Sequence, residues 1–378
     1  MVNSTLEKHL ASPEVSTESH VRAKTISLGK LILERKRVYF DTKFWILLRD
    51  AEIGRNDEAI SILTELRTRV ASKQLVCPIE PSVFLEVMKQ SDIETRIATV
   101  RLIDDLCLGT SLVPLSQRIR QELCEFVYSS SGVNDRFHPN ELVWTKVSYI
   151  LGIFHPSETR FDSATETAIQ KAFFDHMWER PLEELVTALG DRLYPKEWDE
   201  RSAKRINRAN AAHAHEVVSF ERIYRNELIG LLDLFCEDAG EMMLSRLDAA
   251  GGVRTDVTDS QRMEAGRSVM KIIDAAIRKH RPIAKTFRTA HIGALCHAAI
   301  RNDKARSLTT NDLHDIHHAQ AAVIYCDAFF TDKPLHALLS QRRLGLTSDF
   351  DCTIGSDLQS LEEWLESVTW EAPMDGMA

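Results

Sequence analysis

The spacing of apolar positions changes along the chain, and these changes predict where strands lead into helices. An apolar run at 38–40 ends abruptly at Asp41 and continues as an amphipathic stretch, which predicts a buried strand followed by a helix. Residues 56–72 carry apolar side chains at helical spacing, and 74–79 predict a second short strand. A further helix is expected from Pro81, because proline lacks the N–H that a first helical turn leaves unpaired. The chain therefore opens with an α/β pattern.

This pattern is interrupted in the middle of the chain and returns near its end. From about 92 to 300 nearly every window has a helical period, with almost no strand signal. Beyond that block, 311–326 predict a helix, 327–332 a short strand and 334–343 another helix. Since α/β segments stand at both ends, we interpret the helical block as an insertion within one α/β domain.

The expected domain organisation follows from these patterns. Residues 1–25 are rich in Ser, Thr and Glu and lack an apolar period, so we expect a mobile N-terminal arm, with order beginning near Ile26. The α/β domain is expected to comprise 26–115 and 301–378, and an all-helical insertion 116–300.

Composition narrows the class of protein. With 378 residues and 44% hydrophobic content, the chain can bury a sizeable core. No stretch approaches the roughly 18 apolar residues of a membrane span, and the N-terminus lacks the apolar core of a signal peptide. The seven cysteines form no CxxC pair and are expected to be reduced core residues. We therefore expect a cytoplasmic protein that does not contact membranes.

The net charge of −9 argues against a protein that holds nucleic acid by general electrostatic attraction. It does not exclude a nuclease. A site for divalent cations needs clustered carboxylates, and the bound cation reverses the potential that a phosphate meets.

Two aspartates stand at the ends of predicted strands. Asp41 closes the first strand, and Asp332 closes the strand over 328–332 in the same way. Ligand sites in open α/β sheets are built at the carboxyl ends of strands, so neighbouring strands would bring these carboxylates together. Asp41 can instead cap the following helix, and the two roles can coexist.

Glu86 is surrounded by apolar residues on every face of its predicted helix. An unpaired buried carboxylate is costly, and a metal ion or a basic partner would remove that cost. The alternative is a glutamate at the edge of the apolar face that reaches solvent or pairs with Lys89 or Arg96.

Asp315 shares a helix face with Ala319 and Ala322, so its carboxylate is expected to point at the strand ends. Asp327 and Asp312 are weaker candidates, because residues in such positions more often serve at strand edges and helix caps.

Clustered carboxylates raise one another's pKa, so a group of four stays ionised only with a cation among them. Mg²⁺ or Mn²⁺ suits hard oxygen ligands and can also bind phosphate oxygens. Such a site can hydrolyse a phosphodiester with an activated water.

The segments VYFDTKFWILL, PSVFLEVMK and NDLHDIHHAQAAVIYCDAFFTDKPL resemble, in this order, the motifs of PIN-domain nucleases. The resemblance covers about 36–110 and 305–350. It implies a three-layer α/β/α fold with a central parallel sheet, interrupted here by the helical insertion. It also implies a divalent-metal site formed by Asp41, Glu86, Asp315 and Asp332, with Thr331 preceding the last of these. Most members of this family cut RNA, many as toxins of toxin–antitoxin pairs or as defence effectors.

Lys43 departs from the family pattern, which commonly has a small polar residue at this position. His314 and His318, spaced i, i+4, offer a zinc pair as an alternative, although helix histidines are often surface or cap residues and can also contact phosphate. Two basic runs can guide a phosphate backbone or form ordinary solvated helix faces: Arg201, Lys204, Arg205 and Arg208, and Arg278, Lys279, Arg281, Lys285 and Arg288.

The sequence thus predicts a PIN-like endoribonuclease that uses Mg²⁺ or Mn²⁺, with RNA as substrate and, by family analogy, an antitoxin or inhibitor protein as partner. A structure-selective DNA nuclease with the same site is the first alternative. The second is a degenerate nuclease that only binds RNA or protein, a reading that Lys43 favours. The oligomeric state stays open, and a homo-oligomer is compatible with the sequence.

Overall fold

The computed structural model describes residues 2–129, 138–190, 197–213, 219–249, 257–279, 285–303 and 306–370. It is a mixed α/β structure, mostly helical, with a small parallel sheet. The sheet has the order β2-β1-β5-β6, formed by β1 (Lys36–Phe40), β2 (Leu75–Val76), β5 (Ala328–Phe330) and β6 (Thr353–Gly355). All its pairings are parallel.

The sheet joins the two ends of the chain, as the sequence predicts. β1 pairs with β5 in a register that places Phe40 opposite Phe330. The last three residues of β1 and all of β5 are buried, which matches their continuous apolar sequence, since a parallel sheet is covered on both faces. β6 was not predicted. Its three residues, Thr-Ile-Gly, are too few to give a strand signal.

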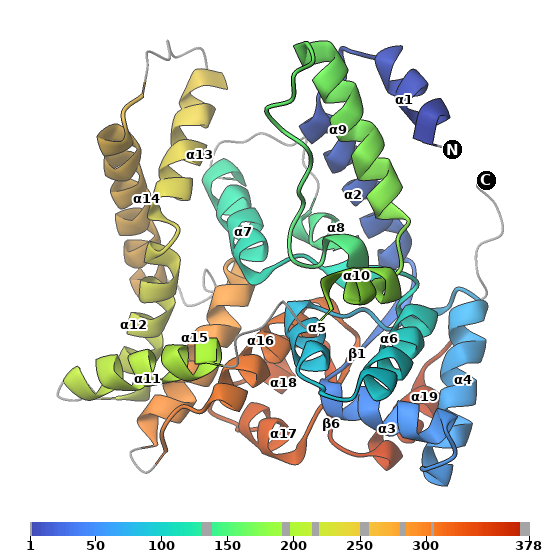
Figure 1. The fold of residues 1–378 in the computed structure, drawn as a ribbon. Helices are drawn as coiled ribbons and strands as arrows, with labels where there is room; N and C mark the ends of the chain where they lie inside the picture. Colours follow the sequence, from blue (N-terminus) through green and yellow to red (C-terminus); the bar gives the residue numbers. More distant parts are fainter. Residues whose placement is uncertain are drawn as a thin grey trace.

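Each strand of the main sheet is followed by a helix with an acidic N-cap, and these caps are Asp41, Glu80, Asp332 and Asp357. In Figure 1 the blue helices α3 and α4 and the red helices near the end of the chain lie together in the lower part of the molecule. The helices that precede the central block are α3 (Thr42–Glu52), η1 (Asp57–Ala59), α4 (Ile60–Ala71), α5 (Pro81–Met88) and α6 (Ile93–Cys107). Those that follow it are α16 (Thr310–Tyr325), α17 (Lys333–Leu339), α18 (Leu346–Asp349) and α19 (Leu358–Ser367).

The central block is largely helical, as expected, but it also contributes a strand. β3 (Thr110–Leu112) pairs antiparallel with β4 (Trp144–Lys146), and Ser111 bridges to Ile79 beside the main sheet. The expectation of an all-helical segment over 116–300 is therefore wrong at β4. Its three residues are held by pairing with β3 and by complete burial of Trp144, which local periodicity does not reveal.

The helices of the central block are α7 (Leu115–Ser129), α8 (Pro139–Leu142), η2 (Val147–Tyr149), α9 (Ser163–Trp178), α10 (Leu182–Leu189), α11 (Glu197–Ala212), α12 (Phe220–Asp233), α13 (Cys236–Ala249), α14 (Asp259–Lys279) and α15 (Arg288–Asn302). In Figure 1, α12, α13 and α14 lie together at the left, and α9 lies at the upper right. α13 packs along α14, where a Cβ on Gly266 would meet the Cys236 carbonyl oxygen at 1.8 Å, so only glycine fits there. α12 packs on α15, and α15 packs on α16.

The N-terminal residues differ from the expected mobile arm. α1 (Val2–Leu10) and α2 (Thr17–Leu33) are helices that pack against α9, and α2 also contacts α8, β1 and β4. Ser16 caps α2 by accepting a hydrogen bond from the Ser19 N–H. The Lys171 ammonium, fully buried on α9, donates to the carbonyl oxygens of Ser12 and Val15 at 2.9 Å. These contacts come from a distant part of the chain, so a local apolar pattern could not predict them.

All seven cysteines are free, and six of them are buried, as expected for reduced core residues. Among the helices that the structure describes, none combines the length and apolar character needed to cross a membrane.

Glu122 is a buried acid of α7 that lies between α15 and α16. Its Oε1 accepts hydrogen bonds from the Thr289 N–H at 2.8 Å, the Thr289 hydroxyl at 2.6 Å and the Tyr325 hydroxyl at 3.2 Å. Burial raises the pKa of Glu122 to about 7, despite these bonds and the nearby charge of Arg288. The folded chain therefore keeps a proton on Glu122 at pH values where the unfolded chain releases it.

Replacing Glu122 by Gln should stabilise the protein in a pH-dependent way. Because the pKa of Glu122 is raised from 4.5 to about 7 in the folded state, wild type loses stability as pH rises through this window, and Gln does not. The gain in the free energy of unfolding should be near zero at acid pH and approach about 3 kcal/mol above pH 7. Urea denaturation across pH measures it. Glu264→Gln, on an exposed site of α14, is the control and should show no such trend. A gain that is equal at every pH would contradict the prediction.

Candidate functional site: an acidic cluster at the strand ends

Asp41 lies at the carboxyl end of β1, directly beside the end of β5. Its N–H donates to the Phe330 carbonyl oxygen at 3.1 Å, and its Oδ2 accepts a 2.8 Å hydrogen bond from the Thr331 hydroxyl. Oδ1 accepts from the Phe44 N–H at 3.1 Å, so Asp41 also caps α3. The predicted strand-end position and the alternative cap role are both confirmed.

Asp332 repeats this arrangement on the neighbouring strand. It follows β5 and Thr331, and its Oδ1 accepts a 2.8 Å hydrogen bond from the Leu335 N–H at the start of α17. Because β1 and β5 are adjacent and in register, the two strand-end aspartates lie on the same edge of the sheet.

Glu86 reaches this edge from α5. Its Oε2 accepts hydrogen bonds from the Thr42 hydroxyl at 2.5 Å and from His318 Nε2 at 3.0 Å. For the alternative partners, the structure shows other contacts. Lys89 lies 2.7 Å from His314, and Arg96 donates to the Gln90 carbonyl oxygen.

His318, on α16, is the buried basic partner of this acid. Its Nδ1 lies 2.8 Å from the Tyr39 hydroxyl and 3.7 Å from Glu80 Oε1, and its side chain is only 2% exposed. Burial lowers the pKa of His318, but the hydrogen bond to Glu86 and the charges of Glu86, Glu80 and Asp41 outweigh this and raise it to about 9. Conversely, although burial raises the pKa of Glu86, the bond and charge of His318 lower it to about 2. An imidazolium therefore stands inside the acidic cluster at neutral pH.

Sequence reasoning missed Glu80 and misjudged His318. Glu80 caps α5 through the Ser82 N–H at 2.8 Å, is 2% exposed, and lies 3.6 Å from the buried guanidinium of Arg118. The signal for Glu80 is an acid within the apolar stretch VCPIEP, immediately before a proline. For His318 the sequence suggests a zinc partner of His314, a surface or cap residue, or a phosphate contact, but not a buried cation beside Glu86.

Asp315 lies one helical turn before His318, on α16. Burial raises its pKa to about 7; the charge of His318 opposes this, and the charges of Asp332 and Glu86 add to it. Burial likewise raises the pKa of Asp41. Among the described residues, Asp315 forms no hydrogen bond through its carboxylate. Each of the four acids therefore lies near the charge of at least one other acid, and Asp315 is the acid whose charge is least balanced by hydrogen bonds.

The acids are gathered but not tightly clustered. In the described parts of the chain, the one set of three His, Cys, Asp or Glu residues whose ligand atoms all lie within 4.8 Å is His9, His20 and Asp175. No three of the four predicted acids reach that spacing. Their carboxylate oxygens suit Mg²⁺ or Mn²⁺ in chemical type, and the unbonded carboxylate of Asp315 is an available ligand.

The weaker candidates lie outside this cluster. Asp312 forms a capping box with Thr309 and an ion pair with Arg306. Asp327 accepts 2.8 Å hydrogen bonds from the backbone and side chain of Arg37, at the opposite ends of the strands. The helix-cap and strand-edge alternatives are thus confirmed.

Lys43 forms its hydrogen bond at the end of β6. Its ammonium donates to the Ser356 carbonyl oxygen at 3.3 Å and lies 5.5 Å from the centre of the Phe44 ring. The residue that departs from the PIN pattern therefore contacts the end of β6 rather than the carboxylates.

In the part of the chain that the structure describes, the predicted zinc pair and the two basic runs add no second site at this edge of the sheet. His314 faces Lys89 while His318 faces Glu86, so these two histidines do not converge as a zinc pair. Lys204 of the first basic run pairs with Glu200. The second run is split between the end of α14 and the start of α15, where Arg278 pairs with Asp274 and Lys285 with Asp349; Arg281 lies outside the described residues.

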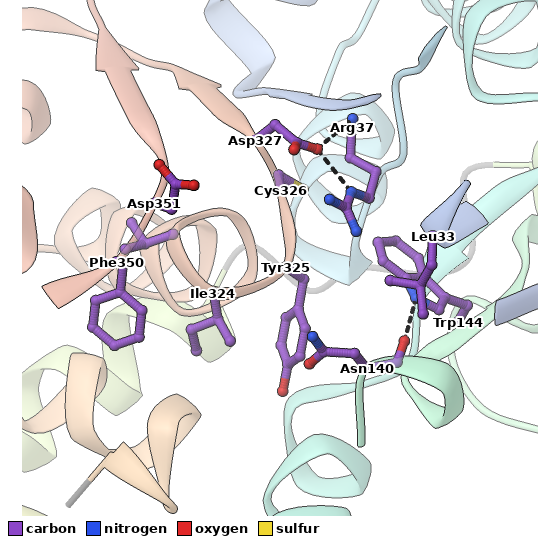
Figure 2. A pocket seen from close by; sticks show the side chains of 11 residues that line it. Leu33, Arg37, Asn140, Trp144, Ile324, Tyr325, Cys326, Asp327, Phe350 and Asp351 are labelled. Carbon is purple, nitrogen blue, oxygen red and sulfur yellow. Dashed lines mark hydrogen bonds and ion pairs between the residues drawn. The ribbon is translucent and has the colours of Figure 1, made fainter. Parts of the chain in front are cut away.

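A cavity of about 200 Å³ opens at the other ends of the strands, and Figure 2 shows its lining. The Arg37–Asp327 pair forms part of one wall, and Tyr325, Asn140 and Trp144 form part of another. It contains none of the four predicted acids.

No family model, curated protein or solved structure matches this chain.

Replacing His318 by Ala should destabilise the protein, because it leaves Glu86 without its buried cation and removes one of the two cations beside Glu80. The expected loss is about 3 kcal/mol in the free energy of unfolding at pH 6. Since the folded pKa of His318 is raised from 6.5 to about 9, its stabilisation is complete below pH 6.5 and is lost as pH rises through 9. The gap between wild type and variant should therefore narrow at alkaline pH.

Urea denaturation at several pH values measures this gap. His176→Ala is the matched control, because His176 is an exposed histidine of α9. An equal loss in both variants, or a gap for His318→Ala that widens with pH, would show that His318 does not act as the internal cation.

Proposed function

We propose that this chain is a PIN-like, metal-dependent endoribonuclease with Mg²⁺ or Mn²⁺ held by Asp41, Glu86, Asp315 and Asp332. The observation that carries the proposal is the convergence of two strand-end aspartates from adjacent parallel strands with acids from two helices. These four residues come from positions 41 to 332. Burial raises the pKa of Asp41 and of Asp315, and the charge of Glu86 adds to both shifts.

The sheet supports the proposed three-layer α/β/α arrangement. Helices pack against its strands, among them α2, α3 and α16 on β1 and α16 on β5. The order β2-β1-β5-β6 puts the strands that carry Asp41 and Asp332 in the centre. Central strand ends are where the ligand sites of open α/β sheets are built.

Each residue has a distinct part in the proposed site. A divalent ion, when bound, neutralises phosphate charge and lowers the pKa of water. Thr331 and the Phe44 N–H hold the Asp41 carboxylate in place, while Thr42 and His318 do the same for Glu86. Asp315, whose carboxylate forms no hydrogen bond to the described residues, is free to turn toward an ion or a water molecule.

A catalytically degenerate binding module is the second candidate function. The imidazolium of His318 favours it, because a cation already compensates Glu86 without any metal ion. In that case the acids serve stability, and the helical block becomes the surface that binds RNA or protein.

Asp41→Asn should abolish metal-dependent cleavage while leaving the fold intact, because Asn caps a helix as well as Asp does. Purified wild type and variant are incubated with end-labelled single-stranded RNA and DNA of one sequence, with Mn²⁺, with Mg²⁺ and with chelator. We expect wild type to cleave RNA only with metal, and the variant to be slower by about 100-fold or more.

Asp162→Asn is the control, because Asp162 is an exposed cap on α9 and should retain wild-type activity. Preferential cleavage of DNA would favour the DNA nuclease. No cleavage by folded wild type, together with no binding of Mn²⁺, would refute the nuclease proposal and favour the binding module.

A further inference from the structure

Three helices converge on one carboxylate far from the acidic cluster. Asp175, on α9, lies 2.8 Å from His9 Nε2 on α1 through one oxygen and 2.8 Å from His20 Nε2 on α2 through the other. The two imidazole rings are 4.8 Å apart and nearly perpendicular. In Figure 1, α1 and α9 lie at the top of the molecule, whereas α3 and α17 of the acidic site lie at the bottom.

The three side chains meet the geometric conditions for a shared ion. Their ligand atoms all lie within 4.8 Å of one another. Bonds of about 2.0–2.2 Å to a tetrahedral ion require ligand atoms that are roughly 3.4 Å apart, so small side-chain rotations suffice. His9 is 4% exposed, and the side chains of His20 and Asp175 are 16% and 17% exposed, so the cluster is largely buried yet reachable.

The chemical type of the three ligand atoms favours zinc over other divalent ions. Two imidazole nitrogens and one carboxylate oxygen suit Zn²⁺, whereas Mg²⁺ and Ca²⁺ prefer sets made of oxygen alone. Three protein ligands leave a fourth position for water.

Neighbouring lysines do not block the site. The Lys24 ammonium lies 3.5 Å from an Asp175 oxygen, but its side chain is 41% exposed and can turn into solvent. Lys171 is buried, but its ammonium donates to the backbone carbonyl oxygens of Ser12 and Val15. Those bonds shape the turn between α1 and α2 and so keep His9 and His20 on the same side of α9.

We propose that His9, His20 and Asp175 form a zinc-binding site that fastens α1 and α2 to α9. This site is independent of the nuclease proposal, since it shares no residue with the acidic cluster. Zinc bound there links the first two helices of the chain to the central helical block. It stabilises the folded protein, because the unfolded chain has no such preformed site.

Metal-free protein is titrated with ZnCl₂ by calorimetry, and thermal unfolding is recorded with and without zinc. We expect one zinc ion per chain and a higher Tm with zinc. His20→Ala and Asp175→Asn should each bind zinc at least about 10–100-fold more weakly and lose the zinc-dependent rise in Tm. His176→Ala, an exposed histidine next to Asp175, should bind zinc as wild type does.

The comparison of Tm with and without zinc distinguishes a metal site from a cluster that only forms hydrogen bonds between the helices. If His20→Ala lowers the Tm of the metal-free protein but wild type shows no zinc-dependent rise, the cluster is only a set of hydrogen bonds and the proposal fails. Zinc binding that persists unchanged in both variants would place the ion elsewhere and also overturn it. Neither readout depends on cleavage of nucleic acid.

Discussion

The pairing of His318 with Glu86 is the interaction on which the acidic edge of the sheet depends. Carboxylates that are partly removed from water repel one another, and each is driven toward its protonated form. His318 supplies a positive charge from within the fold, between Glu86 and Glu80 and in contact with the Tyr39 hydroxyl of β1. The same side chain therefore compensates the charge of the acids and ties α16 to the central strand.

Backbone geometry accounts for the rest of the cluster. A parallel pairing with Phe40 opposite Phe330 brings the next residues, Asp41 and Thr331, into hydrogen-bond contact. Each strand-end aspartate also begins a helix, because its side chain accepts a bond from an N–H of the first turn. The same hydrogen bond therefore caps the helix and holds the carboxylate at the edge of the sheet where a ligand would bind.

The sequence predicted those parts of the fold that local patterns encode. β1 and β5 are apolar runs that stop at an acid, so both their positions and their acidic ends were foreseen. β4 and β6 are three-residue strands stabilised by partners distant in sequence, and no period marks them. α1 and α2 depend on contacts from α9, such as the bonds of Lys171, and His318 owes its charged state to acids on other elements. Such contacts become visible only once the chain is folded.

α16 connects the acidic edge to the helical block. It carries Asp315 and His318, and its Gln320 carbonyl oxygen accepts a 2.9 Å hydrogen bond from the buried Arg118 of α7. Arg118 also lies beside Glu80, so a residue of the central block completes the charge balance around His318. α15 covers another side of α16. The block between the two α/β segments therefore helps to support the acidic edge. If Arg118 were removed, Glu80 would lose its guanidinium partner, and the electrostatic environment that keeps His318 protonated would change.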